Sequence, residues 1–253
     1  MALPQLIAFH GFMGVGRDFE PFEKACGRTF WSPDLIGHGA FQCMDSSQYG
    51  LDAQLEYWSN RIPDGSVLIG YSMGGRLALQ FACRYPNKLA GLVLIGATPG
   101  IQEEKARIQR QHWDRIQANR IVEMGVETFY NEWQKMPIIA TQQNISPSIQ
   151  AEMKSARLAQ SIEGLSQSML HFGTGTMQAC WDALQDLQVP TLLMVGEHDL
   201  KYREIAFQML GRIPKNKSSL AIISKTGHCA HLESLEECSR ILVRWLSEIH
   251  DKI

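Results

Sequence analysis

The chain has 253 residues, of which 45% are hydrophobic and 20% are charged. This balance is typical of a globular protein with a buried core, and the length suits one α/β domain that carries an insertion. The 24 basic and 26 acidic residues give a formal net charge of −2, and the absence of a basic tract argues against nucleic-acid binding and against attachment to an anionic membrane surface.

The amino terminus and the cysteines indicate a compartment. The first residues lack the basic region and the apolar stretch of a signal peptide, and no segment approaches the ~18 continuous apolar residues of a membrane span. The cysteines are scattered and form no C-x-x-C pair. In a chain without an export signal we interpret them as reduced thiols of a cytoplasmic protein, with a disulfide framework as the alternative. They are Cys26, Cys43, Cys83, Cys180, Cys229 and Cys238.

Apolar runs and helical patterns alternate along the first hundred residues. A short apolar run that ends in glycine or proline predicts a buried strand, and apolar residues at helical spacing predict a helix. In chain order the pattern predicts a strand at Leu6–His10, a strand from Phe30 that runs into the glycine-rich turn at 34–39, a helix at Asp52–Asn60, a strand at Val67–Tyr71, a helix at Gly74–Tyr85 and a strand at Leu89–Ile95.

Residues 101–176 break this rhythm. The segment is polar and helical, rich in Gln and Arg, and contains no convincing strand pattern. We expect it to form a helical cap inserted between two halves of a core, which would then comprise residues 1–100 and 177–253.

Strands return after this segment. Thr191–Val195 and Leu220–Ile223 are predicted strands, and Leu232–Ile249 is a predicted closing helix with one apolar face. Strands that are apolar throughout and separated by helices indicate a parallel sheet that is covered on both faces. The predicted fold class is therefore α/β, with a mostly parallel sheet, helices on both faces and a helical cap insertion.

One motif lies where a predicted strand meets a predicted helix. Gly70-Tyr71-Ser72-Met73-Gly74 fits the pattern G-x-S-x-G, and this context is the one in which the pattern marks a nucleophile. The chain must turn sharply at the serine, and the flanking glycines leave room for the neighbouring backbone. The hydroxyl is then presented at a helix N-terminus, whose dipole favours an anion. An ordinary glycine-rich turn is the alternative.

Two further residues complete a nucleophile, base and acid set. Asp199 follows one predicted strand and His228 follows the next, so both lie where open parallel sheets place their sites. The order Ser, Asp, His is that of the α/β-hydrolase fold, which we therefore predict. His228 would take the proton of Ser72, and Asp199 would orient the imidazole. Glu197 is a rival for the acid and His231 for the base, while a zinc site at the two histidines lacks further ligands.

The loop after the first strand reads His10-Gly-Phe-Met-Gly14. Such a loop supplies one backbone N–H to an oxyanion hole, here that of Phe12, and the residue after the nucleophile, Met73, supplies the other. We interpret His10, and equally His38 in its glycine-rich turn, as structural hydrogen-bonding residues rather than catalysts.

Beyond these general motifs, the chain resembles the 2-succinyl-6-hydroxy-2,4-cyclohexadiene-1-carboxylate synthases, the pyruvate-eliminating enzymes of menaquinone and phylloquinone biosynthesis. The similarity runs nearly end to end. The nucleophile and histidine motifs are shared by the whole fold, whereas Arg76, the cap arginines, the Gly-Thr-Gly segment and the Asp-x-Lys-Tyr sequence are more discriminating. The matching stretches are 10–14, 70–76, 98–102, Arg107 with Arg110 and Asp114, Trp133 with Pro137, Arg157, 173–181, 196–202 and 227–231.

The resemblance implies a substrate with three carboxylates, for which guanidinium groups are the natural bidentate partners. It implies that Ser72, activated by the triad, abstracts a ring proton and that pyruvate is expelled without a metal or an organic cofactor. The only partner expected is this small polycarboxylate, and we expect a monomer or weak dimer. Arg107 is interpreted as a solvated residue. The implied substrate-binding residues are Tyr71, Arg76, Gln102, Arg110, Trp133 and Arg157.

Two other functions remain open from the sequence. A carboxylesterase or thioesterase for a small acidic acyl group would use the same triad for covalent catalysis, and burst kinetics on p-nitrophenyl acetate would favour it. A binding protein could use the pocket as a receptor, but all three triad candidates are present. Since only five residues precede Leu6, we also expect the sheet to lack the edge hairpin common in this fold.

Overall fold

A computed structural model describes residues 4–42 and 45–250, so Cys43 lies outside the described residues. Within these ranges six strands form one sheet in the order β2-β1-β3-β4-β5-β6, and all neighbouring strands run parallel. The predicted α/β fold is confirmed, and no strand precedes β1 in the described residues. The strands are β1 Leu6–Phe9, β2 Phe30–Trp31, β3 Ser66–Tyr71, β4 Leu89–Ile95, β5 Thr191–Gly196 and β6 Ser218–Ile223.

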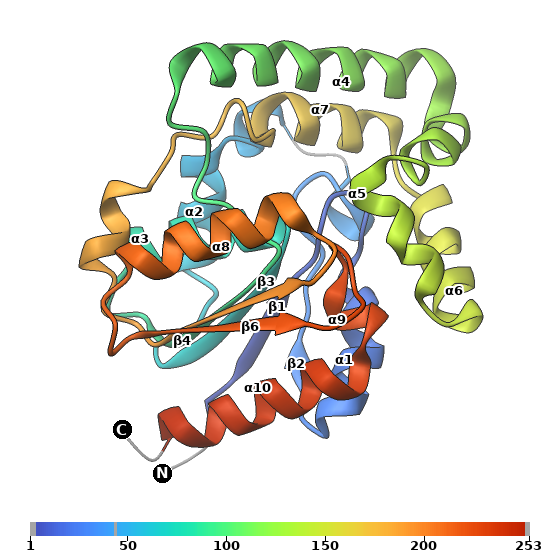
Figure 1. The fold of residues 1–253 in the computed structure, drawn as a ribbon. Coiled ribbons are helices and arrows are strands. Elements are labelled where there is room, and N and C mark those ends of the chain that lie inside the picture. The colour runs from blue at the N-terminus through green and yellow to red at the C-terminus, as the bar shows by residue number, and fades with distance from the viewer. Residues whose placement is uncertain (1–3, 43–44, 251–253) are drawn as a thin grey trace.

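Helices cover both faces of this sheet (Figure 1). Because successive side chains of a strand point to opposite faces, Ile7 and Phe9 of β1 join the cluster formed with α2, α3 and α8. Leu6 and Ala8 join the cluster on the other face, formed with α1 and α10. These core helices are α1 Glu20–Cys26, α2 Leu51–Ser59, α3 Met73–Arg84, α8 Leu200–Arg212, α9 Ala230–Glu233 and α10 Leu235–His250.

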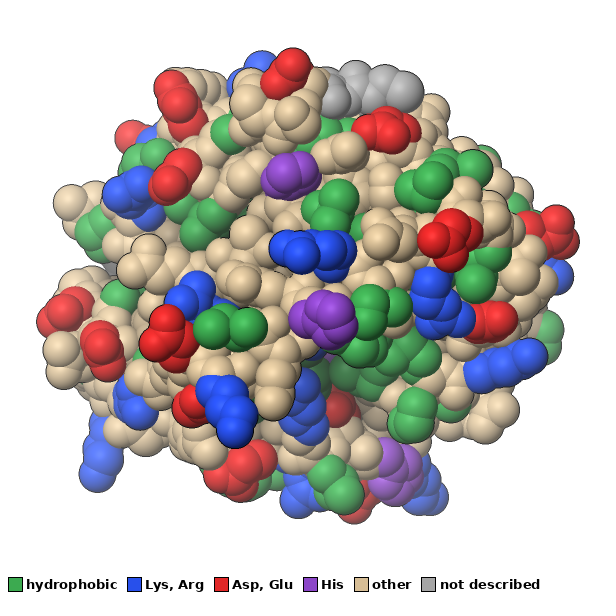
Figure 2. Space-filling model, turned by 90° about the horizontal axis from the view of Figure 1, so that it is seen from above, with side chains coloured by type: hydrophobic (Ala, Val, Ile, Leu, Met, Phe, Trp, Pro, Cys, Tyr) green, Lys and Arg blue, Asp and Glu red, His purple; other side chains and the backbone are tan. Residues whose placement is uncertain are grey.

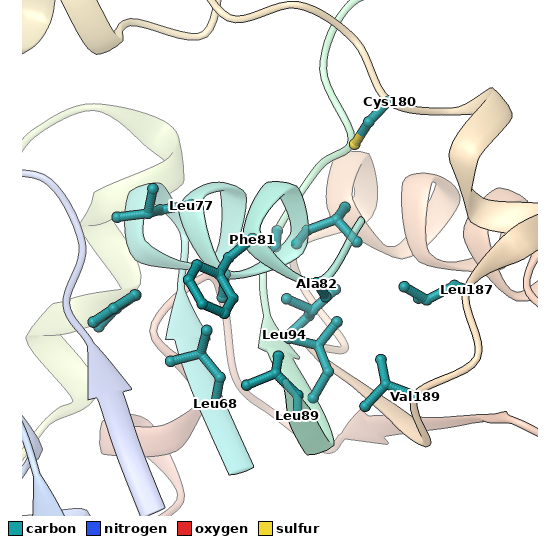
Figure 3. Close-up of a cluster of buried hydrophobic side chains, with 14 of the residues drawn as sticks. Leu68, Leu77, Phe81, Ala82, Leu89, Leu94, Cys180, Leu187 and Val189 are labelled. Atoms are coloured by element: carbon teal, nitrogen blue, oxygen red, sulfur yellow. The ribbon is translucent and has the colours of Figure 1, made fainter. Parts of the chain in front are cut away.

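The packing of α3 on the sheet fixes the segment that carries the serine motif. Leu77 and Phe81 of α3 are fully buried against Leu68 of β3 and Leu94 of β4 (Figure 3). Burial of each such side chain stabilises the fold by roughly 1.5–3 kcal/mol. The two elements that flank this turn, β3 and α3, are therefore both fixed in the core.

The predicted closing helix is wrong in one respect, because it is two helices. Ser234 has φ −140° and ψ 72°, which ends α9 at Glu233 before α10 begins. Ser234 is followed three residues later by Glu237, and its hydroxyl reaches that carboxylate at 3.5 Å. A serine with a glutamate three residues on is a helix-start signal, and it explains the break.

The segment between β4 and β5 folds as helices that lie above the carboxyl ends of the strands (Figure 1). A small hydrophobic cluster joins α4 to α7 through Ile121, Phe129 and Leu165. Gly125, with φ 76° and ψ 167°, breaks the long α4 into two arms. We call this group the cap helices: α4 Glu104–Trp133, α5 Pro137–Ala140, α6 Pro147–Leu158 and α7 Ile162–Phe172.

Membrane-spanning segments and cysteine pairing can be examined over the described residues. No helix among the described residues combines the length and the apolar character that crossing a bilayer requires. The five cysteines within the described residues are all free thiols, namely Cys26, Cys83, Cys180, Cys229 and Cys238.

Candidate active site

Ser72 occupies a sharp strand-to-helix turn at the end of β3. Its backbone has φ 50° and ψ −105°, a region that non-glycine residues rarely adopt. A Cβ atom at Gly70 would lie 2.5 Å from the carbonyl oxygen of Gly74, and one at Gly74 would lie 2.2 Å from that of Phe9. The two glycines are thus required by close backbone contact, and the turn has the geometry of a nucleophile elbow.

His228 and Asp199 converge on this serine. The Ser72 hydroxyl lies 2.9 Å from His228 Nε2, and His228 Nδ1 lies 2.6 Å from Asp199 Oδ2. Both partners are buried, with 3% and 8% of their surfaces exposed. When Nδ1–H donates to the carboxylate, Nε2 is free to accept the serine proton. The structure therefore brings together the predicted nucleophile, base and acid.

The rival residues lie elsewhere. Glu197 follows the end of β5 rather than lying within it, and its carboxylate accepts a hydrogen bond from the Lys225 N–H at 2.8 Å. His231 lies in α9, stacked on Phe19, and its Nδ1 has no hydrogen-bond partner in the described chain. Burial lowers the pKa of His231 to about 3, so its ring is neutral. Residues 4–42 and 45–250 contain no His, Cys, Asp and Glu cluster that could hold a metal.

Glu233 holds the loop that carries His228, a role that was not predicted from the sequence. Its carboxylate accepts from the backbone N–H of Gly227 at 2.7 Å and of Cys229 at 3.2 Å, the two residues that flank the histidine. It also accepts from the hydroxyl of Thr141, just after α5 in the cap, at 3.0 Å. A glutamate at the end of a short helix beside the histidine motif was the available signal, but the pairing of its oxygens depends on the tertiary fold.

The expected oxyanion donors both lie beside Ser72. Phe12 and Met73 line the same cavity as the serine, and neither backbone N–H has a hydrogen-bond partner in the described chain. Met73 is the first residue of α3, so its N–H is one of the donors that a helix N-terminus leaves unsatisfied. Two unpaired amides next to a nucleophile are what an oxyanion hole requires.

His10 and His38 have structural contacts. The Nδ1 of His10 lies 2.8 Å from the carbonyl oxygen of Gly11, and its Nε2 accepts from the Leu35 N–H at 2.9 Å. Burial lowers the pKa of His10 to about 4 and that of His38 to about 3, so both rings are neutral. Neither ring lines the cavity at Ser72.

The main cavity at Ser72 has a volume of about 330 Å³ and is lined by Arg76, Arg110 and Lys201 together with apolar side chains. No carboxylate lines it, although the face of the molecule seen from above carries basic and acidic side chains interspersed (Figure 2). The wall of this cavity therefore has an excess of positive charge next to the nucleophile. Lys201 and Tyr202 had no assigned role from the sequence, and both line this cavity. The apolar part of the wall includes Phe12, Trp113, Trp133, Met136, Ile138 and Phe172.

Arg76 is the most enclosed of these cations. It is 8% exposed, and its guanidinium donates to the carbonyl oxygen of Phe172 at 3.0 Å but meets no carboxylate in the described chain. Burial, followed by the positive charge of Arg110, lowers the pKa of Arg76 to about 10. Arg110 differs, because its Nε donates to Asp114 at 2.7 Å. A buried arginine without an acidic partner favours an anionic ligand.

The other predicted binding residues are distributed around Ser72. Arg157 lines a separate cavity of about 50 Å³, which Ser72 and Tyr71 also line, and it pairs with Asp18 at 3.4 Å. Trp133 lines both cavities. Gln102 is exposed at the start of the cap segment and lines neither, so the structure does not bring it to the site.

Comparisons with known proteins agree with the fold. Residues 4–235 match the family model described as alpha/beta hydrolase fold. A Bacillus subtilis (strain 168) protein, named provisionally as a 2-succinyl-6-hydroxy-2,4-cyclohexadiene-1-carboxylate synthase, is 30% identical over 96% of this chain and 90% of its own length. The Salmonella arizonae protein of that name is 28% identical over 92% of this chain and 89% of its own. The structure of MenH from S. aureus aligns with a TM-score of 0.91 at 30% identity, over 99% of this chain and 96% of that one.

Proposed function

The chain belongs to the α/β-hydrolase fold family and, within it, to the 2-succinyl-6-hydroxy-2,4-cyclohexadiene-1-carboxylate synthases, and we propose that it eliminates pyruvate from 2-succinyl-5-enolpyruvyl-6-hydroxy-3-cyclohexene-1-carboxylate. The observation that carries this proposal is the cavity itself. A hydrogen-bonded serine, histidine and aspartate open into a space whose wall has three cations and no acid. The substrate carries three carboxylates, so its charge complements this wall.

Proton abstraction is the proposed first step. His228 Nε2 takes the proton of the Ser72 hydroxyl, and the serine oxygen removes the ring proton next to the succinyl ketone. Asp199 stabilises the imidazolium that forms. The electron pair of the broken C–H bond becomes an enolate, whose oxygen accepts hydrogen bonds from the N–H groups of Phe12 and Met73. One such preorganised donor lowers a barrier by roughly 3 kcal/mol.

Elimination completes the reaction. The enolate re-forms the ketone, the electrons shift through the ring double bond, and the ring C–O bond to the enolpyruvyl group breaks. The leaving group departs as the enolate of pyruvate and takes up the proton held by the His228 imidazolium, which yields pyruvate and restores the neutral imidazole. We assign carboxylate binding to Arg76 and Arg110 in the main cavity and to Arg157 in the smaller one. Trp133 lines both cavities and Tyr71 lines the smaller one. Their placement around Ser72 supports this assignment.

The cap and the compartment are part of the proposal. We propose that residues 101–176 act as a cap on the core formed by residues 1–100 and 177–253, because α4, α5 and α7 contribute much of the cavity wall. Reduced thiols support a cytoplasmic location for the enzyme.

The test is to offer the enolpyruvyl cyclohexene substrate and measure pyruvate release. We expect turnover by the wild-type protein and a decrease in kcat of at least about 10³-fold in Ser72→Ala. The control is Ser59→Ala, which removes a hydroxyl that donates only to the Glu56 carbonyl oxygen of its own helix and lines neither cavity at Ser72. Absence of pyruvate release, together with a rapid acyl-enzyme burst on p-nitrophenyl acetate, would establish an esterase instead.

A further inference from the structure

The loop of residues 10–14, here called the oxyanion loop, is fixed by the cap as well as by the core. Met13 has φ 62°, a left-handed conformation that non-glycine residues rarely adopt. Its side chain is 1% exposed and belongs to the hydrophobic cluster of Ile121, Phe129 and Leu165 on α4 and α7. The residue that follows Phe12 is therefore packed into the cap helices.

A single cap side chain forms the polar part of this contact. Gln160, which lies just beyond α6, is 6% exposed. Its Nε2 donates to the carbonyl oxygens of Met13 at 3.2 Å and Gly14 at 3.1 Å, and its Oε1 accepts from the Gly39 N–H at 2.9 Å. One buried amide thus holds three backbone groups of the core, two of them in the oxyanion loop.

The core holds the other half of the loop. The carbonyl oxygen of Gly11, in the same peptide unit as the Phe12 N–H, lies 2.8 Å from His10 Nδ1 and accepts from the Gly14 N–H at 3.0 Å. The carbonyl oxygen of His10 accepts from the Gly74 N–H at 3.0 Å, which joins the loop to the elbow. The core therefore holds the peptide unit that carries the Phe12 N–H and the unit before it, Gln160 holds the two units that follow Met13, and the Phe12 N–H itself stays unpaired in the described chain.

We infer that Gln160 is a positioning residue, which fixes from the cap the peptide geometry that directs the Phe12 N–H at the developing oxyanion. This inference rests on the proposed function. Gln160 touches neither cavity lined by Ser72, so its effect must pass through the loop. A misplacement of about 1 Å in such a donor lowers a rate by about 10²-fold.

The test compares Gln160→Met with Gln80→Met. Methionine keeps the length of the glutamine side chain and removes its hydrogen bonds. Gln80 is the matched control, because it is 9% exposed and its Nε2 donates to the carbonyl oxygen of Gln178 at 2.7 Å, away from the oxyanion loop. For Gln160→Met we expect kcat for pyruvate release to fall about 10- to 100-fold with KM within about threefold of wild type, since an oxyanion contact is made mainly in the transition state. For Gln80→Met both constants should stay within about threefold.

Three outcomes would overturn the inference: unchanged kcat in Gln160→Met, a loss of kcat/KM that lies entirely in KM, or an equal loss of kcat in both variants. Thermal unfolding of both variants shows how much folded enzyme each assay contains. Should Gln160→Met not fold, Gln160→Glu retains the acceptor for Gly39 and loses a donor to the loop, and the same loss of kcat is expected. Failure of the proposed function is recognised separately, because wild-type enzyme would then release no pyruvate; the ratio of the two methionine variants on p-nitrophenyl acetate would still test Gln160.

Discussion

Charge distribution around Ser72 is decided by individual residues. Arg76 lies one turn along α3 from the nucleophile, buried beside Phe172 without a carboxylate partner, whereas Arg84 at the end of the same helix is exposed and pairs with Asp52. Two arginines of one helix thus have different environments. The buried one has given up hydration without an ion pair, which a carboxylate of the substrate would supply.

Arg76→Met should remove this interaction while keeping the apolar stem of the side chain. We expect kcat/KM for pyruvate release to fall by a factor on the order of 10² to 10³, which corresponds to roughly 3–4 kcal/mol for a buried charge contact. Steady-state kinetics measure the effect. Arg84→Met serves as the control and should keep wild-type kinetics; equal kinetics of the two variants would remove Arg76 from the binding site.

Between elements, a buried carboxylate joins the cap to the segment that returns to the core. Asp114 of α4 is 1% exposed and accepts from Arg110 Nε at 2.7 Å and from the Gly175 N–H at 3.0 Å. A Cβ atom at Gly173 would lie 2.4 Å from the same carboxylate, which explains a glycine there. Asp114 therefore sets both the path of the chain after α7 and the orientation of a cavity arginine.

Asp114→Asn tests this link, because asparagine has the same shape and no charge. We expect the free energy of unfolding to fall by about 1–3 kcal/mol and KM to increase. The loss of stability is smaller than for a fully buried ion pair, because Arg110 is partly exposed. Urea unfolding and substrate kinetics measure the two effects. The control is Glu248→Gln, which removes an exposed i,i+4 pair with Arg244 and should change neither quantity measurably. A wild-type KM in Asp114→Asn would show that Arg110 is oriented without it.

At the scale of the whole molecule, buried neutral histidines couple stability to pH. Burial lowers the pKa of His10 to about 4 and the pKa values of His38 and His231 to about 3, from an ordinary value of 6.5. Each ring binds a proton more readily in the unfolded chain. A fall in pH therefore stabilises the unfolded state relative to the folded state. The contribution of these neutral histidines to the free energy of unfolding is fully present above pH 6.5. It is lost as the pH falls from 6.5 to the pKa values of the folded state. Asp18, whose pKa is raised by burial, acts in the opposite sense.

We therefore expect the free energy of unfolding to decrease steadily from pH 6.5 to about pH 4, with His10 alone accounting for on the order of 3 kcal/mol. Urea unfolding at a series of pH values measures this slope. His231→Phe should flatten it, since phenylalanine can stack on Phe19 and cannot be protonated, and the histidine Nδ1 has no partner to lose. An identical slope in the variant would show that His231 is not one of the titrating groups.

Features that are local or periodic could be predicted from the residues alone. The alternation of apolar runs and helices specified the parallel sheet, and the glycines on both sides of Ser72 specified the sharp turn, because a strand, a turn and a helix are encoded by neighbouring residues. The order of Ser72, Asp199 and His228 was also readable, since carboxyl ends of parallel strands meet at one edge. The hydrogen-bonded contacts among the three agree with that prediction.

Which side chains share a cavity, and which hold the catalytic loops, depends on how distant segments pack together. Arg157 lies in a different cavity from Arg76, and Gln102 lies in neither, although all three were predicted to take part in substrate binding. The amide of Gln160 meets a carbonyl 147 residues away, and Thr141 meets Glu233 across 92 residues. No local pattern encodes such pairs, because their partners are set by how the cap helices pack on the core.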